Sequence, residues 1–207
     1  METPPDSLVI LLHGVAAFGY DLEPLAGVLR RSLPRTAVVA PDAPFAYEQG
    51  PGRQWYSLEG VTPENRLVRI VAARPAFDAL IRSLVAAQGL EKRLERVALV
   101  GFSQGATLAF DAVARGRWPV GALALLSGRF VAPAPFTPAR MTPVLLVHGS
   151  ADGAVPSEET RRVRAMLQEA DMTVESHILR GVGHTISPTG VKLTRRFLRE
   201  RLGEAGV

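Results

Sequence analysis

The segment Gly-Phe-Ser-Gln-Gly has the residue types and spacing that could do nucleophilic chemistry, with Ser103 at its centre. An apolar run at residues 97–100 precedes it, and a stretch of helical period at 106–115 follows it. A sharp turn between a strand and a helix holds a serine hydroxyl clear of the sheet and aims the helix N-terminus at it. Gly101 and Gly105 fit this turn, because a Cβ there would collide with neighbouring backbone. A serine in an ordinary glycine-flanked loop is the alternative interpretation, and the flanking strand and helix make it the weaker one.

A serine hydroxyl is a weak nucleophile unless a base takes its proton. Two further residues suit that task, because Asp152 follows an apolar run at 144–147 and His184 follows another at 173–179. When a serine nucleophile lies on such a strand-to-helix turn, its acid and then its histidine normally follow it in the chain. Taken alone, Asp152 would be interpreted as a turn or capping residue and His184 as a polar loop residue. Together with Ser103 they predict a nucleophile, a base and an acid that orients the base.

Acyl transfer also needs N–H donors for the negative charge that develops on the carbonyl oxygen. One donor is expected from Gln104, the residue after the serine, and the other from the loop Leu-His-Gly-Val that ends at Val15. The alternative for this second loop is a plain glycine turn.

The remaining histidines and one further aspartate are assigned structural roles. His13 and His148 each end a predicted strand in a His-Gly pair, and each is expected to hydrogen-bond a loop beneath the site. His177 falls inside a predicted strand, away from the edge that carries Ser103. Asp42 ends a strand before the serine in the chain, so we expect it to hold a loop.

The elements that must position these residues alternate along the chain. Strands that are apolar throughout and separated by helices indicate a parallel sheet covered on both faces. We therefore predict an α/β fold with a mostly parallel sheet of six or seven strands, in a single domain of residues 1–207. A segment rich in glycine, proline and aromatic residues, 45–62, stands outside this alternation. Strands are expected at 8–14, 36–44, 97–100, 120–126, 143–149 and 173–179, and helices at 21–33, 63–88, 106–115, 157–169 and 187–202.

Composition narrows the classes of protein. With 47% hydrophobic and 21% charged residues, the 207-residue chain has the composition of a soluble globular protein. The absence of cysteine excludes disulfides, a cysteine nucleophile and thiolate metal sites, and with four histidines we expect no metal and no cofactor. The net charge of +4 comes from scattered arginines, so no nucleic-acid partner is expected. The polar N-terminus and the short apolar runs predict neither a signal peptide nor an integral membrane segment, and hence a cytoplasmic location.

Taken together in order, these motifs resemble the phospholipase/carboxylesterase family of α/β-hydrolases, which includes bacterial carboxylesterases and acyl-protein thioesterases. The resemblance implies the α/β-hydrolase fold, with Ser103 as nucleophile, Asp152 as acid, His184 as base, and Val15 and Gln104 as oxyanion donors. It also implies a small ester or thioester substrate and allows a homodimer, although no unpaired apolar stripe requires one. The matching blocks are LLHGVAAFGYDLEPLA, PDAP followed by RQWY, GFSQGATLAF, LLSGRF, VLLVHGSADGAVP and GVGH.

The chain departs from the family pattern in three places. Family members have a short strand before the first His-Gly loop, whereas only residues 1–7 precede its strand here, so we expect a sheet trimmed at the N-terminal edge. Thr185 stands where the family commonly has an acidic residue. The segment between LLSGRF and MTP, which in the family helps to form the acyl pocket, is short.

Four aromatic residues near the predicted strand ends are candidates for substrate contact, with core packing as the alternative: Phe18, Trp55, Phe102 and Phe130. Arg129 could meet an anionic leaving group, but a solvated side chain is the expectation. The predicted function is a serine hydrolase that cleaves carboxylic esters. The alternatives are a thioesterase, a lysophospholipase or a lactone hydrolase on the same three residues, and a non-catalytic binding protein on a hydrolase scaffold.

Overall fold

The computed structural model describes residues 5–131 and 136–203. Its centre is a six-stranded sheet in the order β2-β1-β5-β6-β7-β8, in which every neighbouring pair is parallel. The predicted parallel α/β sheet is thereby confirmed, and all six strands fall within or overlap the predicted runs. They are β1 (Ser7–Leu12), β2 (Thr36–Val39), β5 (Val97–Phe102), β6 (Ala122–Leu126), β7 (Val144–Gly149) and β8 (Val174–Leu179).

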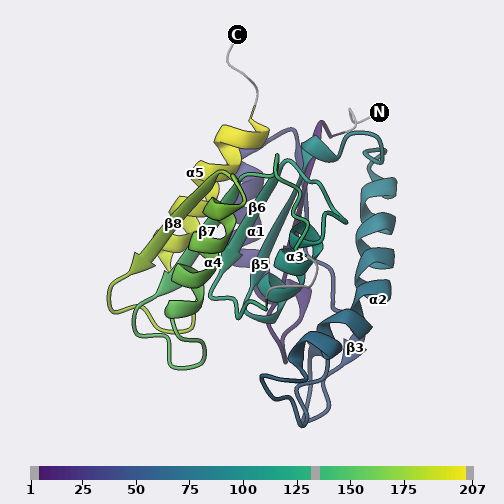
Figure 1. Ribbon diagram of the computed structural model, residues 1–207. Helices are drawn as coiled ribbons and strands as arrows, with labels where there is room; N and C mark the ends of the chain where they lie inside the picture. Colours follow the sequence, from purple (N-terminus) through teal and green to yellow (C-terminus); the bar gives the residue numbers. More distant parts are fainter. Residues whose placement is uncertain (1–4, 132–135, 204–207) are drawn as a thin grey trace.

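Helices cover both faces of the sheet, with α3 and α4 in front of it and α1 behind it in Figure 1. Side chains of successive strand residues point to opposite faces, so in β1 Leu8 and Ile10 pack with the α2 and α3 layer while Val9 and Leu11 pack with α1 and α5. The helices are α1 (Glu23–Ser32), α2 (Arg66–Ala87), α3 (Gln104–Ala114), α4 (Glu158–Glu169) and α5 (Pro188–Leu202), with short 3₁₀ turns η1 (Gly19–Leu22) and η2 (Leu94–Arg96).

The central strands are buried along their whole length. Every residue of β1, β6 and β7 is inaccessible to solvent, which explains why these strands appear in the sequence as continuous apolar runs. Strand β8 lies at one edge and is half-buried throughout. His177 lies within β8, and its Nε2 is 2.5 Å from the carboxylate of Glu175 on the same strand.

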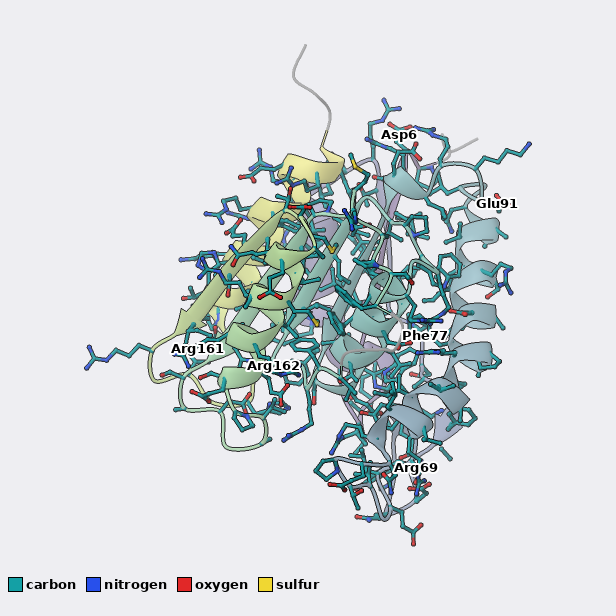
Figure 2. All side chains as sticks on the ribbon, in the orientation of Figure 1. Asp6, Arg69, Phe77, Glu91, Arg161 and Arg162 are labelled. Carbon is teal, nitrogen blue, oxygen red and sulfur yellow. The ribbon has the colours of Figure 1, made fainter. Side chains whose placement is uncertain are left out.

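Helix α2 is apolar on its outer side as well as its inner side. Phe77 is 1% exposed, and Figure 2 shows it on the side of α2 that faces α3. Val68 and Val71 point outward and are 67% and 43% exposed. This exposed pair is an exception to the expectation that no apolar stripe is left without a partner. No helix in the described residues is both long enough and apolar enough to cross a membrane.

The segment at 45–62 contains a small antiparallel hairpin, β3 (Phe45–Ala46) and β4 (Arg53–Gln54). Two backbone hydrogen bonds of 2.9 Å join this hairpin to the loop after β1, from the N–H of Ala16 to the carbonyl of Arg53 and from the N–H of Arg53 to the carbonyl of Ala17. The excursion is therefore tied to the loop that carries the candidate donor Val15.

The N-terminal edge of the sheet is consistent with the trimming that we expected. From residue 5 onward, no strand precedes β1, and β2 forms the edge next to it. Residues 1–4, on which part of this prediction falls, lie outside the described residues.

The close approach of two backbone segments at Gly105 leads to a prediction about stability. A Cβ at Gly105 would lie 2.2 Å from the carbonyl oxygen of Leu12, a backbone atom that cannot rotate away. We expect Gly105→Ala to lower the free energy of unfolding by about 1–3 kcal/mol, measured by urea denaturation, because the backbone must shift.

Gly27→Ala in α1 is the matched control, since its Cβ would meet only the flexible ends of Arg31 at 3.5 Å and Glu23 at 4.0 Å. There we expect an increase of about 0.5–1 kcal/mol, because alanine favours a helix interior over glycine. A similar effect of the two substitutions would contradict the packing argument.

Candidate active site

Ser103 occupies a strained turn between β5 and α3. Its φ of 52° and ψ of −115° lie in a region that residues with a side chain rarely adopt. The turn can form because Gly101 lacks a Cβ, which would lie 2.5 Å from the backbone of Ala106. The N–H of Ser103 donates to the carbonyl of Leu126 at 2.9 Å, so β6 holds the turn in place. The serine hydroxyl therefore stands at the carboxyl edge of the sheet.

The structure brings the three predicted residues together in one hydrogen-bonded chain. The Oγ of Ser103 lies 2.9 Å from Nε2 of His184, and Nδ1 of His184 lies 2.7 Å from Oδ2 of Asp152. Ser103 follows β5, Asp152 follows β7 and His184 follows β8. The carboxyl ends of these parallel strands meet at the same edge of the sheet. The side chain of Asp152 is fully buried, whereas that of His184 is 25% exposed.

Several N–H donors stabilise the buried carboxylate of Asp152. Its Oδ1 accepts hydrogen bonds from the backbone N–H groups of Val155 at 2.8 Å and Ala154 at 2.9 Å. Burial alone would raise the pKa of this carboxyl, but the hydrogen bonds from Val155, His184 and Ala154 outweigh it and hold the pKa below its usual value. An ionised carboxylate only accepts, so Nδ1 of His184 must carry the hydrogen. The lone pair of Nε2 then faces the serine hydroxyl.

His148 contacts the same carboxylate from beneath. Its Nε2 lies 2.9 Å from the carbonyl of Val155 and 3.2 Å from Oδ2 of Asp152, and both partners are acceptors. Nε2 must therefore carry the hydrogen, and Nδ1 accepts from the hydroxyl of Thr160 at 2.8 Å. The sequence predicted that His148 holds a loop, but its contact with the acid was missed, because only the turn after β7 folds Asp152 back over it.

Val15 and Gln104, the predicted oxyanion donors, both line the cavity beside Ser103. The carbonyl of Gly14 lies 2.6 Å from Nδ1 of His13. Because C=O and N–H point in opposite directions across a trans peptide, the N–H of Val15 is turned the other way. The N–H of Gln104 is the first in α3 and has no partner within the helix. In the part of the chain that the structure describes, neither N–H has a hydrogen-bond acceptor.

His13 stays neutral and supports this loop. Burial lowers the pKa of its imidazole, and the hydrogen bond to the Gly14 carbonyl offsets that only in part. The N–H of Ala43 donates to Nε2 at 2.9 Å, which requires an unprotonated nitrogen there. Trp55 completes the support, because its indole N–H donates to the carbonyl of His13 at 2.8 Å.

The structure brings one of the four candidate aromatic residues to the cavities beside the serine. Phe102 lies against His184, with ring centroids 5.0 Å apart. Trp55 and Phe130 are 1% and 2% exposed and pack in the core, which was the alternative interpretation for each. Phe18 stacks on Tyr20 outside both cavities, with centroids 5.2 Å apart.

Two cavities of about 350 Å³ each flank the hydrogen-bonded chain, and both reach His184 and Val15. The Phe102 cavity is lined mainly by apolar groups, including Phe102 and Ile186, and also by Thr185. The Arg129 cavity is lined by Ser103, Tyr56, Leu58, Arg66 and Arg129 among others. Arg66 and Tyr56 were missed, since nothing in their spacing links them to the serine before the chain folds.

Three further expectations concern residues outside the hydrogen-bonded chain and its cavities. The short segment expected to help form the acyl pocket includes residues 132–135, which lie outside the described residues. In residues 5–131 and 136–203, no group of three or more histidine, aspartate and glutamate side chains could hold a metal ion. Asp42 accepts a hydrogen bond from the N–H of Gly19 at 2.7 Å, consistent with a loop-holding role.

A parallel sheet with a serine on a strained strand-to-helix turn, and with an acid and a histidine on later loops, defines an α/β-hydrolase. The sequence profile of the phospholipase/carboxylesterase family matches residues 1–202, and the chain belongs to this family. The predicted membership of the phospholipase/carboxylesterase family is confirmed.

Individual relatives agree with this assignment. The chain is 26% identical to Esterase YpfH of Escherichia coli over 96% of its own length and 84% of that protein. The crystal structure of esterase PE8 superposes with a TM-score of 0.88 and 37% identity, covering 96% of this chain and 94% of that one. A carboxylesterase from Mesorhizobium loti gives a TM-score of 0.79 and 25% identity, covering 95% and 89%. The chain is a carboxylic ester hydrolase.

The low pKa of Asp152 leads to a prediction about stability and pH. A carboxyl whose pKa is lower in the folded than in the unfolded state stabilises the fold above the unfolded value, about 3.9, and this contribution is lost as pH falls through the folded value. We expect the difference in free energy of unfolding between the wild type and Asp152→Asn to shrink from pH 5 to pH 3. Urea denaturation at each pH measures it, and a difference that stays constant would contradict the argument.

Proposed function

We propose that the protein cleaves carboxylic esters through an acyl-enzyme formed on Ser103, with His184 as base and Asp152 as the acid that orients it. The observation that carries this proposal is the continuous hydrogen-bonded chain, 2.9 Å from serine to histidine and 2.7 Å from histidine to aspartate. Val15 and Gln104 support it, because both residues line this cavity and neither N–H has a hydrogen-bond acceptor in the described residues.

In the first half of the reaction, Oγ of Ser103 attacks the ester carbonyl carbon as its proton passes to Nε2 of His184. The carboxylate of Asp152 holds the imidazole tautomer and stabilises the imidazolium. The carbonyl oxygen gains a negative charge, which the N–H groups of Val15 and Gln104 are positioned to stabilise. The carbon–oxygen bond to the alcohol then breaks, and Nε2 returns the proton to the departing alcohol.

In the second half, a water molecule attacks the acyl-enzyme and gives a proton to Nε2 of His184. The bond to Oγ breaks, Ser103 recovers its proton from Nε2, and the carboxylic acid leaves. One ester and one water therefore give one alcohol and one acid, and the enzyme returns to its starting state. The two N–H donors act in both halves, because each half passes through a tetrahedral oxyanion.

The nucleophile assignment is tested by Ser103→Ala. Without the hydroxyl no acyl-enzyme forms, so we expect kcat for a short-chain p-nitrophenyl ester to fall by about 10⁴-fold or more. The wild type should also be labelled at Ser103 by a fluorophosphonate, as peptide mapping would show.

The matched control is Ser83→Ala on α2, where an exposed hydroxyl donates only to the carbonyl of Leu80. This variant should keep the full rate and the full labelling. Near wild-type turnover by Ser103→Ala would remove the serine from the mechanism.

The role of the acid is tested by Asp152→Asn. An amide can donate to Nδ1 of His184 and favour the wrong tautomer, so we expect kcat to fall by about 10⁴-fold, as in other Ser-His-Asp hydrolases. The control is Asp171→Asn, because Asp171 has an 86% exposed side chain and precedes the N-terminal end of β8, whereas His184 follows its carboxyl end. A loss of less than tenfold in Asp152→Asn would show that the carboxylate does not orient the base.

The same residues could act on thioesters, because the nucleophile and the N–H donors contact the acyl carbonyl rather than the leaving group. A panel of esters, thioesters and lysolipids with a range of acyl lengths distinguishes a carboxylesterase from a thioesterase and from a lysophospholipase. We expect the highest kcat/KM for short-chain esters, since each cavity measures only about 350 Å³.

A further inference from the structure

The Arg129 cavity contains two positive charges and no negative one. Arg66 and Arg129 both line it beside Ser103, and no aspartate or glutamate side chain does so in the described residues. Both arginines are half-buried. Asp152 is nearby, but its carboxylate is enclosed behind His184 and fully occupied by hydrogen bonds.

Two half-buried arginines outside this cavity, Arg74 and Arg117, are paired with carboxylates, whereas the half-buried Arg53, Arg69 and Arg96 donate to backbone carbonyls. Arg74 binds both carboxylate oxygens of Asp111, at 2.9 and 2.7 Å, and Arg117 binds Asp78 and Asp111. Their side chains are 18% and 21% exposed. This pairing compensates for the loss of hydration that a charge suffers on burial.

Arg129 and Arg66 lack such a partner. Arg129 donates one hydrogen bond, from Nη2 to the carbonyl of Ala154 at 2.9 Å, which leaves most of its five donors without a protein acceptor. Neither arginine forms an ion pair with a carboxylate in the part of the chain that the structure describes. Two guanidinium groups are thus held in a cavity where a ligand can supply the missing anion.

Tyr56 and the helix termini add to the preference of this cavity for an anion. Burial raises the pKa of the Tyr56 phenol, although hydrogen bonds with Arg66 and Thr107 oppose this, so the hydroxyl remains protonated at neutral pH. Arg66 is the first residue of α2 and Gln104 the first of α3, so the positive ends of two helix dipoles lie at the cavity.

We propose that the substrate is an ester that carries a carboxylate group, which Arg66 and Arg129 bind in the Arg129 cavity while Ser103 attacks the ester carbonyl. This inference rests on the proposed function for the ester chemistry. The uncharged part of the substrate lies in the Phe102 cavity, which is mainly apolar. A guanidinium binds a carboxylate through two parallel hydrogen bonds, so arginine suits this ligand better than lysine would.

Matched substrate pairs test the proposal and identify the side of the ester that carries the charge. Monoethyl adipate is compared with ethyl hexanoate for a charged acyl group, and 4-acetoxybutyrate with butyl acetate for a charged leaving group. In at least one pair we expect kcat/KM for the anionic ester to exceed that for its neutral partner by about 10- to 100-fold, the range for charge-assisted hydrogen bonds. A neutral ester that is as good or better in both pairs would overturn the proposal.

Variants then assign the preference to the two arginines. The double variant Arg66→Gln/Arg129→Gln should bring the ratio of kcat/KM within the preferred pair close to one, and Arg129→Lys should give an intermediate ratio. Arg129 also donates to the carbonyl of Ala154, so its replacement could move the loop that holds Asp152. Such a movement would lower kcat/KM for the neutral ester as well, so the ratio within each pair is not affected by it. Arg82→Gln is the control, because Arg82 is exposed on the same helix α2 and lines neither cavity. An unchanged ratio in the double variant would also overturn the proposal.

Binding without turnover separates this proposal from the proposed function. Calorimetry with Ser103→Ala measures the affinity for monoethyl adipate and for 4-acetoxybutyrate with both arginines present and with both replaced by glutamine. We expect the replacement to weaken binding of the preferred ester by about 10- to 100-fold. If the wild type hydrolyses none of the four esters, the proposed function fails, and this binding result still decides whether the cavity binds a carboxylate.

Discussion

The buried carboxylate of Asp152 is the interaction on which the rest of the site depends. A carboxylate without solvent contact stays ionised only when hydrogen-bond donors replace the lost water. Here Val155, Ala154, His184 and His148 surround it, at distances from 2.7 to 3.2 Å. Because the group is ionised, it fixes the hydrogen on Nδ1 of His184 and leaves the lone pair of Nε2 for the serine. The arrangement at Ser103 thus depends on the loop after β7, a different strand from the one that carries the serine.

A second network holds the loops that carry Gln104 and Val15, the proposed oxyanion donors. The side chain of Gln104 accepts from the N–H of Trp55 at 2.8 Å and donates to the carbonyl of Tyr56 at 2.7 Å, which joins the start of α3 to the excursion at 45–62. Trp55 in turn donates to the carbonyl of His13. Through these contacts the buried Trp55, a candidate for substrate contact with core packing as the alternative, holds the loop that leads to Val15.

The two cavities beside Ser103, Asp152 and His184 differ from each other in polarity. The Phe102 cavity has a mainly apolar lining, whereas the Arg129 cavity has two guanidinium groups and the N-termini of two helices. Figure 2 shows other arginines, such as Arg161 and Arg162, on the outer helix α4, where each forms an ion pair with a glutamate of the same helix. Arg66 and Arg129 instead line a cavity beside Ser103, where a bound anion can contact them, and the proposed preference for a carboxylate-bearing ester rests on this difference.

The amino-acid sequence by itself determined the parallel sheet, the family, and the order of Ser103, Asp152 and His184 along the chain. Apolar runs report burial on both faces, and a glycine-bounded serine reports a turn that only glycines permit, so both signals are local. Tertiary structure alone decided which side chains reach the cavities. The sequence does not distinguish the buried Trp55 and Phe130 from the pocket-lining Phe102, because all three lie beside motifs at strand ends. Arg66 and Arg129 line the same cavity, and His148 contacts Asp152. Both proximities depend on how loops from separate strands and helices fold over one edge of the sheet.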